Sequence, residues 1–326
     1  MGRNRGLLLF AVKVAISLAL LYVAVHFVNF GVLRQRLYHL DYFWIAAALI
    51  TLSLQLTLAS LRWQRIAEFG GGRLSVGGAV LYTLIGSFFS QVLPSTVGGD
   101  AARIWLLARD AGAWKNAIFS VLTDRIAGLI WLAVLVLFCL PWSLALIANP
   151  VGRTTLILIG LAGAAAPVGL LMLSLLGGTS IARWKAVRHL ADIAKTVWTV
   201  LTSARTGAAV AVMSIAVHLM TVAVLWFCAQ AVGSSFTFLN SLLLIPPVIL
   251  ISAIPLSIAG WGVRESAMIA AFTYAGLPES DGLLVSILFG ASSFVIGAAG
   301  GVAWSLSANR IRLRSLREAK AHAMDV

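Results

Sequence analysis

Two ten-residue segments of this chain, 161 residues apart, follow one pattern of proline, glycine and arginine. Segment 94–103 reads Pro-Ser-Thr-Val-Gly-Gly-Asp-Ala-Ala-Arg, and segment 255–264 reads Pro-Leu-Ser-Ile-Ala-Gly-Trp-Gly-Val-Arg. Each segment interrupts an apolar stretch and then places an arginine there. Broken hydrophobic segments at corresponding positions of two halves predict an inverted repeat with a binding site between the halves.

The composition places these segments in a membrane. Apolar residues make up 60% of the chain and the mean hydropathy is +0.97, which is typical of an integral membrane protein. A crossing helix needs about 20 residues to span about 30 Å of hydrocarbon. Six stretches are long enough: 7–28, 42–61, 117–140, 154–176, 207–232 and 283–306. We therefore predict an all-α integral membrane protein with six crossings.

Two further apolar stretches are too short to cross, and each is followed by a second short segment. These pairs are 79–93 with 100–111, and 239–254 with 262–275. The first stretch ends at Pro94, and the second is broken by Pro246-Pro247 and ends before Pro255, because proline ends or kinks a helix. Two short helices joined at membrane depth by non-helical backbone form a re-entrant hairpin, which must be buried in protein or line a wet cavity. We predict one such hairpin in each half.

The excess of basic residues indicates a cytoplasmic membrane face and not a nucleic-acid partner. The net charge is +13, but no basic domain with interleaved aromatic residues is present to hold a nucleic acid. Cytoplasmic loops collect Lys and Arg and contact anionic headgroups. Six crossings place both termini and the five basic residues of 177–206 in the cytoplasm. The alternative, eight full crossings, would place those five outside, against this rule.

The predicted organisation is two membrane halves separated by a connector. Residues 1–176 form the first half with hairpin 79–111, and 207–308 form the second half with hairpin 239–275. Residues 177–206 form a basic amphipathic helix in the headgroup layer, and 309–326 form a basic cytoplasmic tail. Three crossings per half invert the second half relative to the first, so the two hairpin tips are expected to meet near the midplane.

Charged residues within the predicted membrane segments are the main site candidates, since each costs at least about 2.5–3.5 kcal/mol on insertion scales. They are Asp100 and Arg103 in the first hairpin, Asp124 and Arg125 in a crossing helix, and Arg264 and Glu265 in the second hairpin. Arginine binds phosphate oxygens in pairs through its planar fork. The alternative is that the acids neutralise the arginines as buried pairs that only fix the fold.

Small and polar residues beside these charges are further candidates. Each hairpin begins its second helix just after glycines, where free backbone N–H groups and the helix dipole favour an anion. Gly98, Gly99, Gly260 and Gly262 would form tight turns, although glycines also let helices pack closely. Ser95, Thr96 and Ser257 could donate hydrogen bonds to a ligand or to freed backbone.

The sequence carries no enzyme motif. It has no His/Cys cluster for zinc, no GxSxG nucleophile turn and no Walker loop, so we expect no catalytic residue, no metal site and no cofactor. Cys139 and Cys228 lie in apolar segments and are predicted to be small buried hydrophobes.

At these residues the chain resembles the flippase-like membrane domain of lysylphosphatidylglycerol synthases. The resemblance rests on segment 94–103, on Thr123-Asp124-Arg125 followed by Gly128-Leu129, and on Ser257 to Glu265. It runs from the first helix to about residue 306. Ala259 and Trp261 depart from the small or aliphatic residues expected in the second glycine motif, and the synthases' soluble aminoacyl-transferase domain is not expected here.

The resemblance implies a protein that moves a polar lipid between membrane leaflets, with the six charged candidates as its functional positions. We therefore expect a multi-pass protein of a bacterial inner membrane that binds an anionic or phosphate-bearing lipid. Two alternatives stay open: an accessory subunit that binds a lipid-synthesis or lipid-linked sugar enzyme, and an ion-coupled carrier for a small anion. The sequence does not indicate the lipid, the direction of movement or the oligomeric state.

Overall fold

The computed structural model describes residues 39–93, 97–176, 185–254 and 262–322, and every regular element in these ranges is an α-helix. The first expected crossing, 7–28, lies outside them. The helices are α3 (Tyr42–Phe69), α4 (Val76–Val92), α5 (Gly98–Ala111), α6 (Trp114–Leu146), α7 (Pro150–Leu176), α8 (Lys185–Thr202), α9 (Ala204–Ala231), α10 (Phe238–Ser252), α11 (Val263–Tyr274) and α12 (Glu279–His322). Five of them are long and apolar enough to cross a membrane, namely α3, α6, α7, α9 and α12. These match the five predicted crossings that fall within the described residues.

The helices of the second half repeat the order of the first at nearly constant spacing. Helices α9, α10, α11 and α12 begin 162, 162, 165 and 165 residues after α3, α4, α5 and α6. The packing is reciprocal, because α4 packs against α12 and α10 packs against α6, while α3 and α9 pack on each other. Asp41 N donates to Ala231 O at 3.0 Å and Arg62 Nη1 donates to Ser214 Oγ at 3.1 Å, so α3 and α9 are antiparallel. Antiparallel contact between equivalent helices is the arrangement that an inverted repeat requires.

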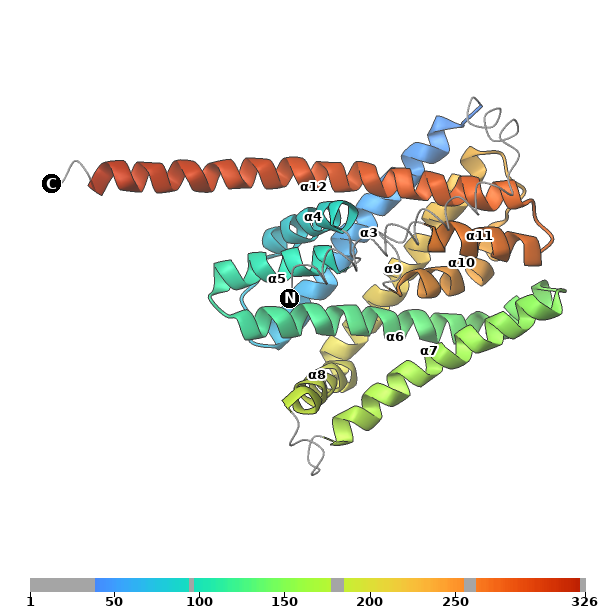
Figure 1. Ribbon diagram of the computed structural model, residues 1–326, viewed down its shortest axis with the longest axis horizontal. Coiled ribbons are helices and arrows are strands. Elements are labelled where there is room, and N and C mark those ends of the chain that lie inside the picture. The colour runs from blue at the N-terminus through green and yellow to red at the C-terminus, as the bar shows by residue number, and fades with distance from the viewer. Residues whose placement is uncertain (1–38, 94–96, 177–184, 255–261, 323–326) are drawn as a thin grey trace, which may run out of the picture.

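The two short helix pairs enter from opposite ends of the molecule. Helices α4 and α5 enter and leave at the end toward which α12 runs, whereas α10 and α11 do so at the other end (Figure 1). Helix α4 has 17 residues and α10 has 15, which is short for a full crossing. The joining segments 94–96 and 255–261 lie outside the described residues. The depth at which these hairpins turn in a bilayer stays a prediction.

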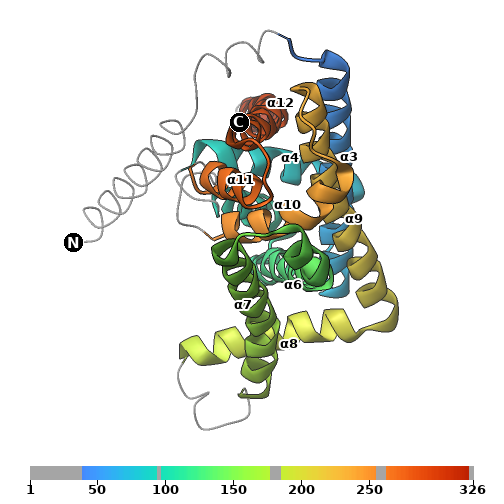
Figure 2. The same cartoon turned by 90° about the vertical axis from the view of Figure 1, so that its right-hand side faces the viewer.

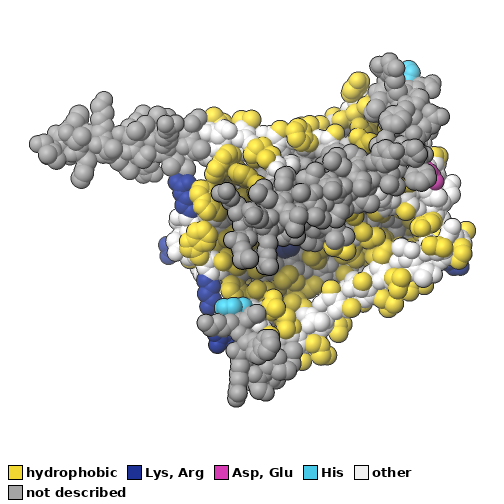
Figure 3. All heavy atoms as spheres, in the orientation of Figure 1, with side chains coloured by type: hydrophobic (Ala, Val, Ile, Leu, Met, Phe, Trp, Pro, Cys, Tyr) yellow, Lys and Arg dark blue, Asp and Glu magenta, His cyan; other side chains and the backbone are white. Residues whose placement is uncertain are grey.

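Basic side chains gather at one end of the long axis. Figure 3 shows Lys and Arg concentrated around the end where α5 meets α6. Arg73 lies in the α3–α4 loop and Lys115 lies at the start of α6, while Glu279 and Asp281 begin α12 at the opposite end. This separation of charge follows the positive-inside pattern along the same axis as the crossing helices.

Helix α10 continues through Pro246-Pro247, so the predicted break at these prolines is wrong. A proline at 247 has no N–H to donate to the carbonyl of Leu243 four residues earlier. The hydroxyl of Ser143 in α6 lies 2.9 Å from Leu243 O and satisfies it instead. A side chain from a neighbouring helix thereby replaces the lost backbone hydrogen bond, as is common for prolines in membrane helices.

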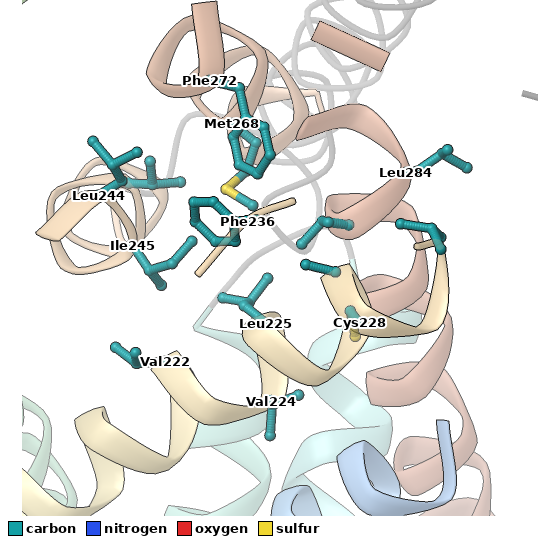
Figure 4. Close-up of a cluster of buried hydrophobic side chains, with 14 of the residues drawn as sticks. Val222, Val224, Leu225, Cys228, Phe236, Leu244, Ile245, Met268, Phe272 and Leu284 are labelled. Carbon is teal, nitrogen blue, oxygen red and sulfur yellow. The ribbon is translucent and has the colours of Figure 1, made fainter. Parts of the chain in front are cut away.

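A buried apolar cluster holds the second half together. Figure 4 shows Phe236, which precedes α10, lying among side chains from α9, α10 and α11. Phe236 is fully buried, and its ring lies 4.5 Å from that of Phe272, centroid to centroid. Cys228 is buried in the same cluster and Cys139 is buried elsewhere, both as free thiols, which confirms the prediction of small buried hydrophobes. This cluster fixes α11, which carries two of the predicted site residues.

Helix α8 lies across the bundle. Figure 2 shows it running transverse to α7 and α9. Ala191, Ala194, Val197 and Val200 form its buried face at a spacing of three residues, while charged side chains such as Arg188 and Lys195 are exposed. An amphipathic basic helix that is transverse to crossing helices is suited to the headgroup layer.

Candidate functional site

Helices α3, α5 and α6 bring five charged side chains together, here named the charge cluster: Arg62, Asp100, Arg103, Asp124 and Arg125. Asp124 accepts from Arg62 Nε at 2.9 Å through Oδ1 and from Arg103 Nη2 at 3.0 Å through Oδ2. Asp100 Oδ2 accepts from Arg125 Nη2 at 2.7 Å, and Asp100 Oδ1 lies 3.5 Å from Arg103 Nη1. Arg103 therefore bridges the two carboxylates.

Local structure places the α5 members of the cluster. Asp100 lies in the first turn of α5, where the helix dipole favours a carboxylate, and Arg103 follows one turn later on the same face. A Cβ at Gly99 would lie 2.1 Å from Ser90 Oγ and 2.4 Å from Gly86 O, so only glycine allows this approach of α5 to α4. Gly98 is crowded in the same way by Leu93. For these two glycines the structure therefore favours close packing, the alternative that the sequence left open.

The charge cluster carries more positive than negative charge. Its three guanidinium groups face two carboxylates, and Asp100, Asp124 and Arg62 are all buried. Arg103 stacks over the Trp63 ring at 4.1 Å from the centroid, and among the described residues its buried Nε has no hydrogen-bond partner. The third cation, Arg125, leaves the cluster with one excess positive charge, and an unused N–H on the largely buried Arg103 is costly. The chemistry of the cluster is therefore that of an anion site.

The sequence predicts that Arg125 pairs with Asp124 or a hairpin acid, because an unpaired buried guanidinium is costly, and the structure confirms a pair with Asp100. Its Nη2 and Nε lie 2.7 Å and 2.8 Å from Asp100 Oδ2. The Arg125 side chain is 50% exposed, in contrast to 11% for Arg103. Arg125 therefore forms the open edge of the cluster.

The second hairpin holds a closed ion pair. Arg264 Nη2 lies 2.7 Å from Glu265 Oε1, and Ser286 Oγ lies 2.9 Å from both Arg264 Nε and Glu265 Oε1. The remaining oxygen, Oε2, accepts from Gly262 N at 2.6 Å. Gly262 has a φ of 86°, which suits glycine, so this residue forms the predicted tight turn. One positive and one negative group balance here, and both side chains are buried.

Four predicted site residues, Ser95, Thr96, Ser257 and Gly260, lie outside the described residues. The inverted repeat also predicts that Arg103 and Arg264 point into one shared cavity near mid-depth. This stays a prediction, because the hairpin tips, 94–96 and 255–261, lie outside the described residues. Within the described residues, Arg103 forms ion pairs with acids of α5 and α6, and Arg264 forms one with Glu265.

Sequence reasoning missed Arg62. It placed the crossing at 42–61 and Arg62 in a cytoplasmic loop, but α3 continues to Phe69 and buries Arg62 against Asp124 and Ser214. Hydropathy falls at this point because the helix carries charge, not because it ends. The available signal was Trp63. This large aromatic residue directly follows Arg62, at a point where the predicted loop would expose it to solvent.

An apolar groove of about 560 Å³ begins beside the cluster on α6. Its first lining residue, Ile126, follows Arg125 directly. The other walls come from α7 and the end of α10, and the lining residues are Leu129, Ile130, Ala133, Ile159, Ala162, Gly163, Ala166, Pro167, Leu170, Leu250, Ile251, Ala253 and Ile254. A groove lined this way suits a hydrocarbon chain.

A smaller cavity of about 260 Å³ between α3, α4 and α12 is polar at several points. Gln55 and Gln91 both line it, together with Ser87, Ser90 and Ser293. Both are polar residues within apolar stretches, which the sequence allows to face a cavity. The cavity adds uncharged hydrogen-bonding groups next to the α4–α5 hairpin.

These features define an all-helical, multi-pass membrane protein with buried charges beside an apolar groove. The family model for the lysylphosphatidylglycerol synthase TM region matches residues 10–301, and the chain belongs to this family. That confirms the resemblance found in the sequence and relates the protein to lipid handling. Comparison with curated proteins gives no match.

Proposed function

We propose that the protein moves a phosphate-bearing polar lipid between the two leaflets of a bacterial inner membrane, with both chain termini in the cytoplasm. The observation that carries this proposal is the excess positive charge of the charge cluster, whose third cation, Arg125, lies half-exposed at its edge. A lipid phosphate would supply the missing negative charge. The unused Nε of Arg103 would gain a charge-assisted hydrogen bond, which is stronger than a neutral one.

The apolar groove favours a lipid over a small soluble anion. It begins one residue beyond Arg125, whose side chain is half-exposed at the edge of the cluster. A lipid could therefore place its phosphate at Arg125 and Arg103 while an acyl chain occupies the groove between α6 and α7. A small anion would leave the groove without a role.

The test is lipid movement in proteoliposomes containing fluorescent phosphatidylglycerol, read by the fraction of label that an external quencher reaches. We expect Arg103→Gln to lower the rate at least about tenfold, since a charge-assisted hydrogen bond is worth about 1.5–3 kcal/mol. Arg103→Lys should restore only part of it, because lysine lacks the paired donors of arginine. Arg153→Gln, at an exposed arginine near the start of α7, is the matched control.

The outcomes separate the alternatives. Arg103→Gln moving lipid at the parent rate would overturn the proposal. A parent protein that binds lipid but moves none would favour an accessory subunit of a lipid-synthesis enzyme. Uptake of inorganic phosphate without lipid movement would favour a small-anion carrier.

A further inference from the structure

A polar cavity of about 420 Å³ lies between the end of α3, the start of α6 and the transverse helix α8. We name it the α8 cavity. Its lining residues are Ile66, Phe69, Gly70, Lys115, Asn116, Phe119, Ser120, Thr123, Asp192, Lys195, Thr196 and Val200. One of its walls is the start of α6, at the end of the molecule where Figure 3 shows Lys and Arg concentrated. None of the sequence-predicted site residues lines it.

Two lysines face one acid in this cavity. Lys115 comes from α6 and Lys195 from α8, and Asp192 is the only acid among the lining residues. Within the described part of the chain neither lysine forms an ion pair, although Lys115 Nζ lies 5.9 Å from the Phe119 ring centroid. The cavity therefore carries an unbalanced positive charge contributed by two separate helices.

The wall of the cavity nearest the charge cluster offers an unused hydroxyl group. Thr123 is fully buried, and its Oγ1 has no hydrogen-bond partner among the described residues. A buried hydroxyl without a partner is costly unless a ligand or water completes it. Thr123 therefore points, independently of the lysines, to an occupant that accepts or donates hydrogen bonds.

The α8 cavity is adjacent to the charge cluster. Thr123 directly precedes Asp124, which holds Arg62 and Arg103. On the same wall, Ser120 Oγ lies 3.3 Å from Trp63 Nε1, and the Trp63 ring stacks on Arg103. A group bound in the cavity is therefore separated from Arg103 by one side-chain layer.

We propose that the α8 cavity is a second phosphate site, which takes the headgroup of the transported lipid before it reaches the charge cluster. This inference rests on the proposed function and extends it by naming a place of entry. The transverse, amphipathic helix α8 favours a lipid headgroup as the source of the phosphate, since such a helix lies at the depth of the headgroups. Lys115 and Lys195 bind the phosphate oxygens, and Thr123 donates the third hydrogen bond.

The test is equilibrium retention of radiolabelled phosphatidylglycerol by the purified full-length chain, with inorganic phosphate as competitor. We expect Lys115→Gln with Lys195→Gln to weaken retention about tenfold or more, since two charge-assisted hydrogen bonds are lost. Thr123→Val should weaken it severalfold without unfolding the protein, because the two side chains are nearly the same size and the hydroxyl has no protein partner to lose. Arg188→Gln removes an exposed charge from the same helix without touching the cavity and is the control.

Two outcomes would overturn the inference. Unchanged lipid retention in both the lysine and the threonine variants would show that the α8 cavity does not bind the lipid. Lysine-dependent binding of inorganic phosphate, with lipid retention unaffected, would leave an anion site but overturn its assignment to a lipid. If Arg103→Gln blocks lipid movement while the cavity variants behave like the parent, this inference fails and the proposed function stands. If Arg103→Gln moves lipid normally, the proposed function fails instead.

Discussion

The two hairpins share a sequence motif and a reciprocal place in the fold, yet their charges are arranged differently. In the first hairpin, Arg103 belongs to a cluster of three cations and two anions, and its Nε has no hydrogen-bond partner among the described residues. In the second, Arg264 forms a balanced, buried pair with Glu265 that Ser286 and a backbone N–H complete. An open, unbalanced cluster suits ligand binding, whereas a closed pair suits structural support.

The difference arises from where the acid lies relative to the arginine. In the first hairpin the acid, Asp100, precedes Arg103 by three residues and can reach Arg125 as well. In the second, Trp261 occupies the position of Asp100 and the acid is the next residue, Glu265. At the same offset of 161 residues, Arg62 corresponds to Ala223. The second hairpin therefore lacks the extra cation, because Ala223 stands at the position of Arg62. It also lacks an acid at the position of Asp100.

Removing Arg264 should have the largest effect on stability. Arg264→Gln leaves the carboxylate of Glu265, which is 0% exposed, without its guanidinium. Breaking a buried pair in this way costs about 3–5 kcal/mol. Thermal unfolding in detergent measures the loss, and the double variant Arg264→Gln with Glu265→Gln should recover most of it. Equal stability of the single variant and the parent would contradict the structural role of this pair.

The packing of the first hairpin should give the next largest effect. Gly99→Ala places a Cβ within 2.4 Å of Gly86 O, so α5 must shift and take Asp100 with it. Overpacking of this kind costs about 1–3 kcal/mol, and lipid movement should fall with it. Gly169→Ala in α7 meets nothing within 4 Å and is the control. Normal stability of Gly99→Ala would show that α5 and α4 are less closely fitted than the structure indicates.

The crossing helices could be located from the sequence because apolar length marks them, although α3 continues past its apolar stretch to Phe69. The described crossings and both short helix pairs fall where the apolar segments predict them. The partners of the charged residues could not be predicted, because Asp124 meets Arg62 across 62 residues and Ser143 reaches Leu243 across 100. Such contacts depend on helix rotation and packing, which hydropathy does not specify.

The repeated sequence motif also does not show that the charges of the two hairpins are arranged differently. Identical Pro, Gly and Arg positions led to one expected role for Arg103 and Arg264. Their surroundings differ because Trp63, Asp124 and Arg62, which surround Arg103, lie on helices outside the repeated segment. A motif predicts the local backbone, while the electrostatic character of a site is set by its neighbours.

A smaller effect should distinguish the two arginines through lipid-dependent stability. Arg103→Gln leaves two cations and two anions in the charge cluster, so the protein should unfold at or above the parent temperature without lipid. Added phosphatidylglycerol should raise the unfolding temperature of the parent more than that of the variant, because a ligand stabilises only the form that binds it and the variant keeps the α8 cavity alone. At ten times the dissociation constant the difference amounts to about 1.4 kcal/mol. A variant that lipid stabilises as strongly as the parent would place the anion site elsewhere.

The smallest expected effect concerns α10, the proline-containing helix of the second hairpin. Its counterpart in the first hairpin, α4, contains no proline. Ser143→Ala removes the hydroxyl that satisfies Leu243 O, the carbonyl left without a backbone donor by Pro247. An unsatisfied buried carbonyl costs about 1–3 kcal/mol, and we expect the lower end because replacing one hydroxyl by hydrogen leaves little empty space. Ser305→Ala removes an exposed hydroxyl that bonds only within its own helix, to Gly301 O, and should change stability by less than about 0.5 kcal/mol. Comparing the two unfolding temperatures isolates the inter-helix bond. Equal values would mean that α10 tolerates its prolines without help from α6, and that the second hairpin is held by the ion pair and the Phe236 cluster alone.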